Sequence, residues 1–236
     1  AGLLSKFTYC KISHPLSKKT LSSLEQLLRK RNSHCFLKLF YDAGILHELF
    51  ANFRKVLHMP QFDGYHHYPV DIHSIECVKA LENIKEPFIQ NLYTQLSGED
   101  KLLLKTVTLF HDTGKGRTQD HSEVGAKLIV PFLKQIHLKE ESIARAVTLV
   151  KNHILMSGVA FKQNIHNEKT LYKFMSSVGD VKNLNMLYVL TYADINGVGG
   201  DTYNSFNAKL LFELYKSALE VSQNSGRITD AKKRVI

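Results

Sequence analysis

The sequence lacks the features that mark membrane, secreted and zinc-finger proteins. No run of about eighteen apolar residues occurs in the chain, so no transmembrane helix is expected. The opening segment AGLLSKFTYCK is too short and too polar for a secretory signal. The cysteines Cys10, Cys35 and Cys77 are odd in number, far apart and without a CxxC pair. This pattern favours a reducing, cytoplasmic location over a disulfide framework or a structural zinc site.

The chain also lacks a basic stripe interleaved with aromatic residues, so no nucleic-acid partner is expected. Its formal net charge is nevertheless +9, from 31 lysines and arginines against 22 acidic residues. A charge of this sign favours phosphates, nucleotides or acidic proteins as partners, although a basic, solvated surface is the simpler interpretation. The hydrophobic fraction of 44% is enough for a sizeable core.

Strand-like alternation is absent as well, and apolar residues recur at helical spacing almost everywhere. The spacing therefore predicts an all-α fold. Helices are expected at 21–31, 35–59 with a break at Gly44, 73–84, 99–110, from about 120 to 136, 141–156, 168–178, 181–194 and 207–221. No repeat or low-complexity linker divides them. We predict a looser N-terminal helical subdomain over 1–60 and the main domain over 61–236, joined as one continuous helical unit.

Polar side chains mark the expected starts of four helices. Ser22 and Glu25 have the spacing of a capping box, and Asp71, Ser97 and Asp120 each stand before an apolar helical pattern.

Four polar residues occupy positions that helical spacing assigns to an inward face: His73, His111, His153 and Asp194. A single inward histidine is more often a hydrogen-bonded core residue than a metal ligand. An inward aspartate needs a cation or strong donors, because a buried unpaired carboxylate is energetically costly. Helices that each deliver an imidazole or a carboxylate therefore indicate a shared divalent cation. Mixed nitrogen and oxygen ligands favour zinc, manganese, iron or cobalt over calcium.

Asp112 directly follows His111, and this pair is a sharper signal. Adjacent helical residues point about 100° apart, so both can face one ion only where the helix ends. The following Thr113-Gly114 favours such an end. Here the chain resembles the HD-domain phosphohydrolase superfamily, whose pattern is a His, a His-Asp doublet and a distant Asp. The resemblance implies an HD-domain helical bundle with its active site between helices.

Longer segments are similar to one group within that superfamily. These segments are FDGYHHYPVDIHSI, LFHDTGKGRTQDHSEVGA, VKNHILMS and LYVLTYADINGVGGDTYNSF. They resemble the uridylyl-removing HD domain of bifunctional PII uridylyltransferases over about residues 37–218. The resemblance implies a cytoplasmic hydrolase that releases UMP from the uridylylated nitrogen-regulatory protein PII. Nothing upstream of residue 60 resembles the nucleotidyltransferase domain with which the family's enzyme begins, and the chain stops at KKRVI, whereas that enzyme ends with ACT domains. The chain is therefore expected to be either an excised central domain or a reduced or divergent relative.

The resemblance also implies a ligand set for one or two divalent ions, which are expected to be manganese, iron, zinc, cobalt or magnesium. Asp112 is expected to bridge two such ions, which would activate a water molecule for attack on phosphorus. The predicted catalytic residues are Asp112, Lys115 and His121. The implied metal ligands are His73, His111, Asp112, His121, His153 and Asp194.

Several residues are predicted to contact the substrate. Lys115 can place an ammonium group against a phosphate oxygen, with an exposed loop lysine as the alternative. Arg117 has the same two interpretations. His66 matches a position in the family's YH motif. Tyr203 and Asn204 match an aromatic-Asn block, although an aromatic residue at a helix start is equally well explained by packing.

Two other functions stay open at this point. The HDTGK segment also resembles HD phosphohydrolases that act on small nucleotides or cyclic dinucleotides, but the GYP element of the latter is missing. A non-catalytic, nucleotide-binding regulatory module is the second alternative. The intact His-Asp doublet and the downstream histidines favour an enzyme over such a module.

Overall fold

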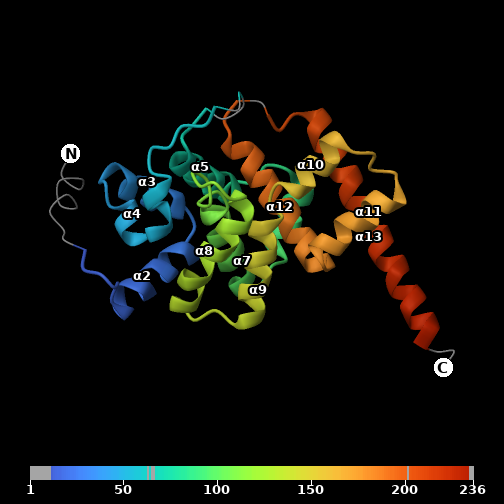
Figure 1. Cartoon of the computed structure of the whole chain (residues 1–236), viewed down its shortest axis with the longest axis horizontal. Helices are drawn as coiled ribbons and strands as arrows, with labels where there is room; N and C mark the ends of the chain where they lie inside the picture. The colour runs from blue at the N-terminus through green and yellow to red at the C-terminus, as the bar shows by residue number, and fades with distance from the viewer. Residues whose placement is uncertain (1–11, 63, 65–66, 201, 234–236) are drawn as a thin grey trace.

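The computed structural model describes residues 12–62, 64, 67–200 and 202–233, with side chains up to residue 223. All regular elements in these ranges are helical, which confirms the all-α prediction. They are α2 (Lys18–Arg29), α3 (Ser33–Asp42), α4 (Leu46–Leu49), the 3-10 helix η1 (Ala51–Lys55), α5 (Val70–Glu82), α6 (Pro87–Thr94), α7 (Gly98–Phe110), α8 (His121–Gln135), α9 (Glu140–Lys151), α10 (Leu155–Lys162), α11 (Glu168–Val178), α12 (Val181–Gly197) and α13 (Ser205–Lys233) (Figure 1).

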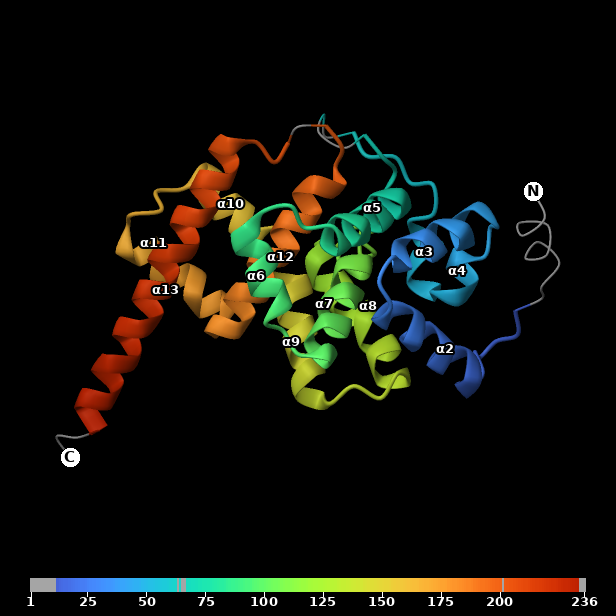
Figure 2. The same cartoon turned by 180° about the vertical axis from the view of Figure 1, so that it is seen from behind.

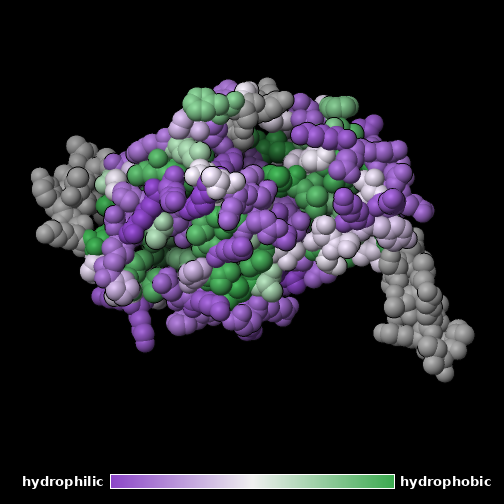
Figure 3. Space-filling view, in the orientation of Figure 1, coloured by the Kyte–Doolittle hydropathy of each residue, from purple (hydrophilic) through white to green (hydrophobic). Residues whose placement is uncertain are grey.

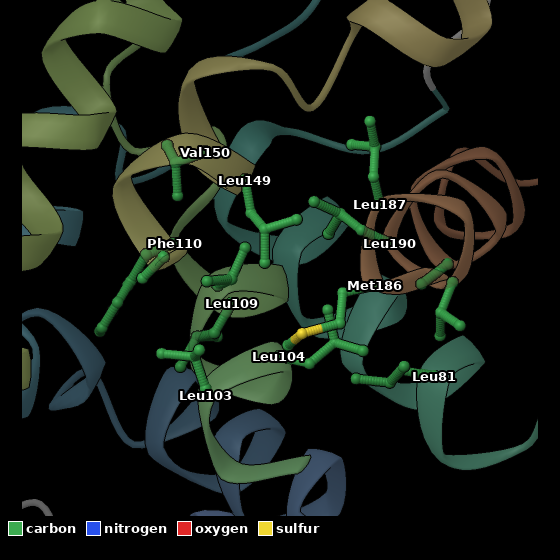
Figure 4. Close-up of a cluster of buried hydrophobic side chains, with 14 of the residues drawn as sticks. Leu81, Leu103, Leu104, Leu109, Phe110, Leu149, Val150, Met186, Leu187 and Leu190 are labelled. Atoms are coloured by element: carbon green, nitrogen blue, oxygen red, sulfur yellow. The ribbon is translucent and has the colours of Figure 1, made fainter. Parts of the chain in front are cut away.

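The centre of the molecule is formed by α5, α7, α9 and α12. Helix α12 packs along α5, while α7 contacts both α5 and α9, and α8 lies along α9. Leucines from all four central helices meet in one buried cluster, with Leu81, Leu104, Leu149 and Leu187 at most 1% exposed (Figure 4). These helices are therefore held rigidly enough to position polar side chains at their ends.

The N-terminal helices lie at one end of this centre, and α10, α11 and α13 lie at the other (Figures 1 and 2). Helix α2 packs on α7 and α3 packs on α5. Their buried residues Leu28 and Leu37 belong to the same hydrophobic cluster as the central leucines. The subdomain boundary at residue 60 stays a prediction.

Hydrophilic residues cover much of the face seen in Figure 3, and apolar residues appear between them in patches. Within the described residues, no helix combines the length and the apolar character needed to cross a membrane.

Two of the predicted helix starts are confirmed and two are wrong. The Ser97 hydroxyl accepts a hydrogen bond from the Asp100 amide, and the Asp120 carboxylate accepts from the amides of Ser122 and Glu123. The first helix begins earlier than predicted, at Lys18, because the Ser17 hydroxyl caps it. Ser22 and Glu25 therefore lie inside that helix.

Asp71 does not cap α5, which already begins at Val70 after Pro69. Its buried carboxylate instead accepts a hydrogen bond from the backbone amide of His58, at 2.7 Å. The predicted helix 141–156 is also interrupted, since α9 ends at Lys151 and α10 begins at Leu155. His153 thus lies in a turn between two helices.

Candidate metal centre

The structure brings the six predicted metal ligands together at the ends of five structural elements. The first turn of α5 carries one histidine, the end of α7 carries the His-Asp doublet, and α8 begins with another histidine. The turn after α9 and the last turns of α12 provide the others. Four of the six residues are nearly inaccessible to solvent, at no more than 2% exposed. The residues are His73, His111, Asp112, His121, His153 and Asp194.

Two histidines and two aspartates define one half of the cluster. The His73 Nε2 atom lies 2.9 Å from Asp194 Oδ1 and 3.7 Å from Asp112 Oδ2. The His111 Nε2 atom lies 3.4 Å from Asp194 Oδ1 and 3.5 Å from Asp112 Oδ2. Ligand atoms bound to one ion at about 2.1 Å are separated by about 3–4 Å. These nitrogen and oxygen atoms therefore have the spacing of a common coordination sphere.

The other half of the cluster faces the second oxygen of Asp112. Its Oδ1 atom lies 3.5 Å from His153 Nε2 and 3.8 Å from His121 Nε2. The rings of His111 and His153 are in edge-to-face contact, and so are those of His153 and His121. Each carboxylate oxygen of Asp112 thus faces a different pair of histidines, which is the geometry that a bridging carboxylate requires.

Hydrogen bonds to the backbone fix the orientation of two of these rings. The Nδ1 atom of His111 lies 2.8 Å from the carbonyl oxygen of Thr108, and Nδ1 of His153 lies 2.7 Å from that of Val150. A carbonyl only accepts, so Nδ1 carries the proton in both rings. In a neutral ring, Nε2 then offers its lone pair to the cluster, as in metal-ligating histidines.

Two buried nitrogens at the centre have no hydrogen-bond partner among the residues that the structure describes. Within the described part of the chain, neither His111 Nε2 nor His121 Nε2 makes a hydrogen bond. Leaving a buried polar atom unsatisfied is costly, and such atoms in a native structure call for an explanation. A divalent ion among lone pairs and carboxylates supplies that explanation, so the residues fit a metal.

Both carboxylates are held in their ionised form. Burial opposes ionisation of Asp112, but the charges of His111 and Lys115 outweigh it and hold its pKa well below the ordinary value. Burial likewise opposes ionisation of Asp194, whose pKa is nevertheless held well below the ordinary value by His111 and His73. The centre therefore presents negative charge to a cation.

Two glycines allow the helices to approach closely enough to form this centre. A Cβ atom on Gly197 would lie 2.2 Å from the Cys77 Sγ atom, so glycine lets α12 press against α5 and places Asp194 beside His73. A Cβ atom on Gly114 would lie 1.9 Å from the His121 carbonyl oxygen, so glycine lets the turn after α7 meet the start of α8. The role of Gly197 was not predicted from the sequence.

Cys77 was also missed as a neighbour of the centre, although its position four residues after His73 was a signal. Burial raises the pKa of its thiol well above the ordinary value. The Sγ atom lies 3.4 Å from Nε2 and 3.6 Å from Nδ1 of His73. Sulfur nearly equidistant from both nitrogens lies over the ring face rather than in line with Nε2. This thiol packs on a ligand ring.

Lys115 is the predicted substrate contact that lies inside the centre. Its Nζ atom is 2.7 Å from Asp112 Oδ2 and donates a hydrogen bond to Gln61 Oε1 at 2.6 Å. Arg117 instead donates from one guanidinium nitrogen to the carbonyl oxygens of Thr113 and Lys115. That nitrogen stabilises the turn after α7. The substrate roles of Lys115 and Arg117 stay predictions, and Gln61 carried no signal in the sequence.

Two of the remaining predicted contacts, Tyr203 and Asn204, are held by residues other than the six predicted ligands. The ring of Tyr203 packs against Tyr192 with centroids 4.8 Å apart, and the Asn204 side chain accepts from the amide of Asn207 at the start of α13. His66 lies outside the described residues. The roles of these three residues in substrate binding stay predictions.

Comparison with known proteins agrees with this geometry. Residues 70–178 match the family model described as HD domain. The chain belongs to the HD-domain family. The matched range contains five of the six clustered residues and ends before Asp194.

Three curated relatives of this HD-domain chain share the name bifunctional uridylyltransferase/uridylyl-removing enzyme. The protein from Cereibacter sphaeroides is 34% identical over 224 residues, and that from Ruegeria pomeroyi is 34% identical over 222 residues. The protein from Bradyrhizobium diazoefficiens is 32% identical over 216 residues. Each match covers 89% of this chain but only 23–24% of the relative. The chain thus spans about a quarter of the length of these relatives. Together, the family and the relatives support a metal-dependent hydrolase.

Proposed function

We propose that this chain hydrolyses a phosphodiester with one or two divalent ions, and that its substrate is a uridylylated PII-type protein from which UMP is released. The observation that carries the proposal is the placement of Asp112. Each of its carboxylate oxygens faces a separate pair of histidines. A carboxylate shared in this way would hold two ions close together, and pairs of ions about 3.5–4 Å apart promote phosphodiester hydrolysis in known enzymes.

The ligands divide into two sets around Asp112. His73, His111 and Asp194 would hold the first ion, while His121 and His153 would hold the second. Divalent ions in such sites lower the pKa of water and neutralise charge on the phosphate. Manganese, iron, cobalt, zinc and magnesium all remain compatible with this set of nitrogen and oxygen ligands.

Lys115 is proposed to neutralise charge on the phosphate as it develops in the transition state. Its ammonium group has three N–H donors, of which Asp112 and Gln61 use two. The third donor is available to a non-bridging phosphate oxygen, and charge-assisted hydrogen bonds of this kind strengthen as negative charge builds up. Gln61 positions Lys115, because its own amide nitrogen is anchored to the Tyr68 carbonyl oxygen.

His121 is proposed to exchange protons with the reacting groups. Burial and the neighbouring His153 lower its pKa below the ordinary value, which favours the neutral ring. Its side chain is 28% exposed, which makes it more accessible than the rings of His73, His111 and His153. When the first site alone is filled, the Nε2 lone pair of His121 can accept a proton from an incoming water, and the ring can return one to the leaving group.

The relatives support UMP as the group released, because uridylyl removal is part of their shared name. A PII-type protein partner follows from the resemblance of the HD-domain segments to enzymes that act on PII. Such a partner would place the reaction in the cytoplasm, in agreement with a sequence that has three widely spaced cysteines and no CxxC pair.

The first experiment tests hydrolysis itself. The purified chain is incubated with Mn²⁺ and bis-p-nitrophenyl phosphate, and Asp112→Asn is compared with the matched control Asp42→Asn, at an exposed position at the end of α3. We expect the control to retain wild-type rates and Asp112→Asn to lose measurable turnover. Equal rates in all three proteins would refute metal-dependent hydrolysis at this centre and leave a non-catalytic module.

The second experiment identifies the substrate. Uridylylated PII and a panel of mononucleotides and cyclic dinucleotides are offered side by side to the wild-type chain with Mn²⁺. Release of UMP from the protein substrate supports the proposal. Cleavage of a nucleotide without UMP release would exclude PII and favour the small-nucleotide alternative.

A further inference from the structure

A cavity of about 500 Å³ lies between α2, α5, α6 and α7, apart from the metal centre. Figure 2 views these helices from the side on which α6 lies in front. Sites for small molecules typically have volumes of about 300–1,000 Å³. The cavity contacts Leu81 and Glu82 in the last turn of α5, whereas His73 lies in the first turn, about 13 Å away along the helix axis at 1.5 Å per residue. Nothing in the proposed hydrolysis uses it.

One part of the cavity wall is apolar. Leu28, Leu81, Ile84 and Leu102 line it, and each is at most 8% exposed. The ring of Tyr93 contributes a further wall, and burial raises the pKa of its hydroxyl to about 12, so the phenol is uncharged at neutral pH. A ligand with an apolar body would exclude water from these side chains and gain from that contact.

The other part of the wall is cationic, and Lys105 is its innermost residue. The Lys105 side chain is 5% exposed, and its Nζ atom donates to the Lys30 carbonyl oxygen at 2.7 Å and to Glu82 Oε1 at 2.5 Å. An ammonium group has three donors, so one has no partner among the described residues. Because charge interactions are strengthened by burial, this donor would attract an anionic group strongly.

The other lining cations add to this positive charge. Among the described residues, no carboxylate lies within 4.0 Å of the side-chain nitrogens of Lys30, Arg31 or Lys101. The carboxylate that lines the cavity is Glu82, and it is already bound by Lys105 and His34. The cavity therefore carries more positive than negative charge next to an apolar wall.

We propose that this cavity binds a small organic anion. Its acidic group, a carboxylate, sulfonate or phosphate, would contact Lys105, Lys101 and Arg31. Its apolar body would lie against the leucines. The combination of an apolar wall with a few converging polar donors is typical of specific small-molecule sites.

The test uses a fluorescent probe of the same chemistry, anilinonaphthalene sulfonate, with its uncharged analogue phenylnaphthylamine for comparison. The full chain is titrated with each probe in 0.1 M NaCl, with and without Mn²⁺. We expect the sulfonate to bind one site per chain with the same affinity in both conditions, and to bind about tenfold more tightly than the neutral analogue, a difference of about 1.4 kcal/mol. Equal binding of the two probes, or binding that depends on Mn²⁺, would overturn the proposal.

Glycine substitutions locate the bound probe. Gly98 lines the cavity, and the space where its Cβ atom would lie is open, so Gly98→Phe would fill the cavity without backbone strain. Gly158 in α10 has equal space and supplies the matched control Gly158→Phe. We expect at least about tenfold weaker sulfonate binding in Gly98→Phe and wild-type affinity in the control. Wild-type affinity in a folded Gly98→Phe protein would refute the site.

Charge substitutions test whether the probe binds in this cavity even if Gly98→Phe does not fold. Lys30 and Arg31 are exposed, so Lys30→Ser/Arg31→Ser should fold, and Lys169→Ser/Lys173→Ser on α11 removes the same charge from a distant surface. We expect the first pair to weaken sulfonate binding about threefold or more and the second pair to have no effect. Equal affinities in the two pairs would overturn the proposal.

Discussion

The metal centre and the cluster around Glu82 are both buried groups of charged side chains that involve α5 and α7, but their hydrogen bonding differs. Glu82 accepts from the Ser33 amide at 2.9 Å and hydroxyl at 2.7 Å, from Nδ1 of His34 at 2.5 Å, and from Lys105 at 2.5 Å. Positive and negative charges are paired, and the first amides of α3 gain an acceptor from α5. The Glu82 carboxylate therefore has its hydrogen-bond partners without a metal ion.

The metal centre is incomplete by the same standard. It gathers two carboxylates and four imidazoles, yet the Nε2 atoms of His111 and His121 lack hydrogen-bond partners within the described chain. A cluster whose carboxylate is fully hydrogen-bonded can thus fix the packing of helices. A cluster with unpaired nitrogen atoms can instead bind a cation. Removing one carboxylate should therefore mainly lower turnover at the metal centre, whereas at the Glu82 cluster it should mainly lower stability.

The largest effect is expected at the metal centre. Asp194→Asn should lower the turnover of bis-p-nitrophenyl phosphate with Mn²⁺ by at least about 10³-fold, because several kcal/mol of charge stabilisation depend on the bound ion. The free energy of unfolding without metal should change less than in Glu82→Gln, because the Asp194 side chain is 21% exposed and water can replace part of its hydrogen bond to His73. Turnover and urea unfolding measured on the same preparation check both parts. If Asp194→Asn lost activity only because it was largely unfolded in the assay, the proposed role of Asp194 in turnover would be contradicted.

The Glu82 cluster should show the reverse pattern. Glu82→Gln leaves the Lys105 ammonium buried without its counter-charge, and breaking a buried pair in this way typically costs about 3–5 kcal/mol. Turnover per folded molecule should stay at the wild-type value, since Glu82 lies at the far end of α5 from His73. Urea unfolding measures the cost. The double variant Glu82→Gln/Lys105→Met should regain part of it, and no recovery would count against the pairing.

The loss of stability in Glu82→Gln should depend on pH. Burial raises the pKa of Glu82, but hydrogen bonds from Lys105, His34 and Ser33 outweigh burial and lower it below the ordinary value of 4.5. A carboxyl group with a lowered pKa in the folded state stabilises the fold above its unfolded pKa and loses this contribution as the pH falls. The stability difference between wild type and Glu82→Gln should therefore narrow below pH 4.5. A constant difference over this range would show that the charge of Glu82 is not its source.

The sequence predicted the metal centre better than the Glu82 cluster, for a physical reason. His73, His111 and Asp194 interrupt apolar faces, so helical spacing reveals them locally, and the His-Asp doublet adds Asp112. Glu82 lies in the last turn of a helix, where a glutamate is ordinary, and its partners Ser33 and Lys105 are 49 and 23 residues away in sequence. Such pairing is decided by how helices pack, which one sequence does not reveal.

The same limit explains the misplaced details of the fold. The start of α5 was predicted after Asp71 because aspartate favours the N-cap, but its carboxylate is used by the distant amide of His58. The break at His153 was hidden because apolar periodicity continues across the turn between α9 and α10. Helix type and order were readable from periodicity, whereas boundaries depended on tertiary hydrogen bonds.

Metal addition gives the next largest effect. A ligand that binds only the folded state stabilises it by about 2.7 kcal/mol at a concentration one hundred times its dissociation constant. Mn²⁺ added to EDTA-treated protein should therefore raise the melting temperature of wild type and of Glu82→Gln by similar amounts. Asp194→Asn should show a much smaller rise. Thermal unfolding followed by circular dichroism measures all three, and an equal rise in Asp194→Asn would place the ion elsewhere.

The smallest effect concerns two helix caps, only one of which touches the metal centre. Ser97→Ala removes the cap of α7 and should cost about 1 kcal/mol of stability without changing turnover, because the other end of that helix carries His111. Asp120→Ala removes the cap of α8, whose first residue is His121, so it should also lower turnover severalfold. Asp120→Asn keeps a capping oxygen and should retain most of the activity, which separates the position of His121 from the charge of Asp120. Equal turnover in Ser97→Ala and Asp120→Ala would mean that the α8 cap does not position His121, and the ring would then be held in the centre by its contacts with His153 and Asp112 alone.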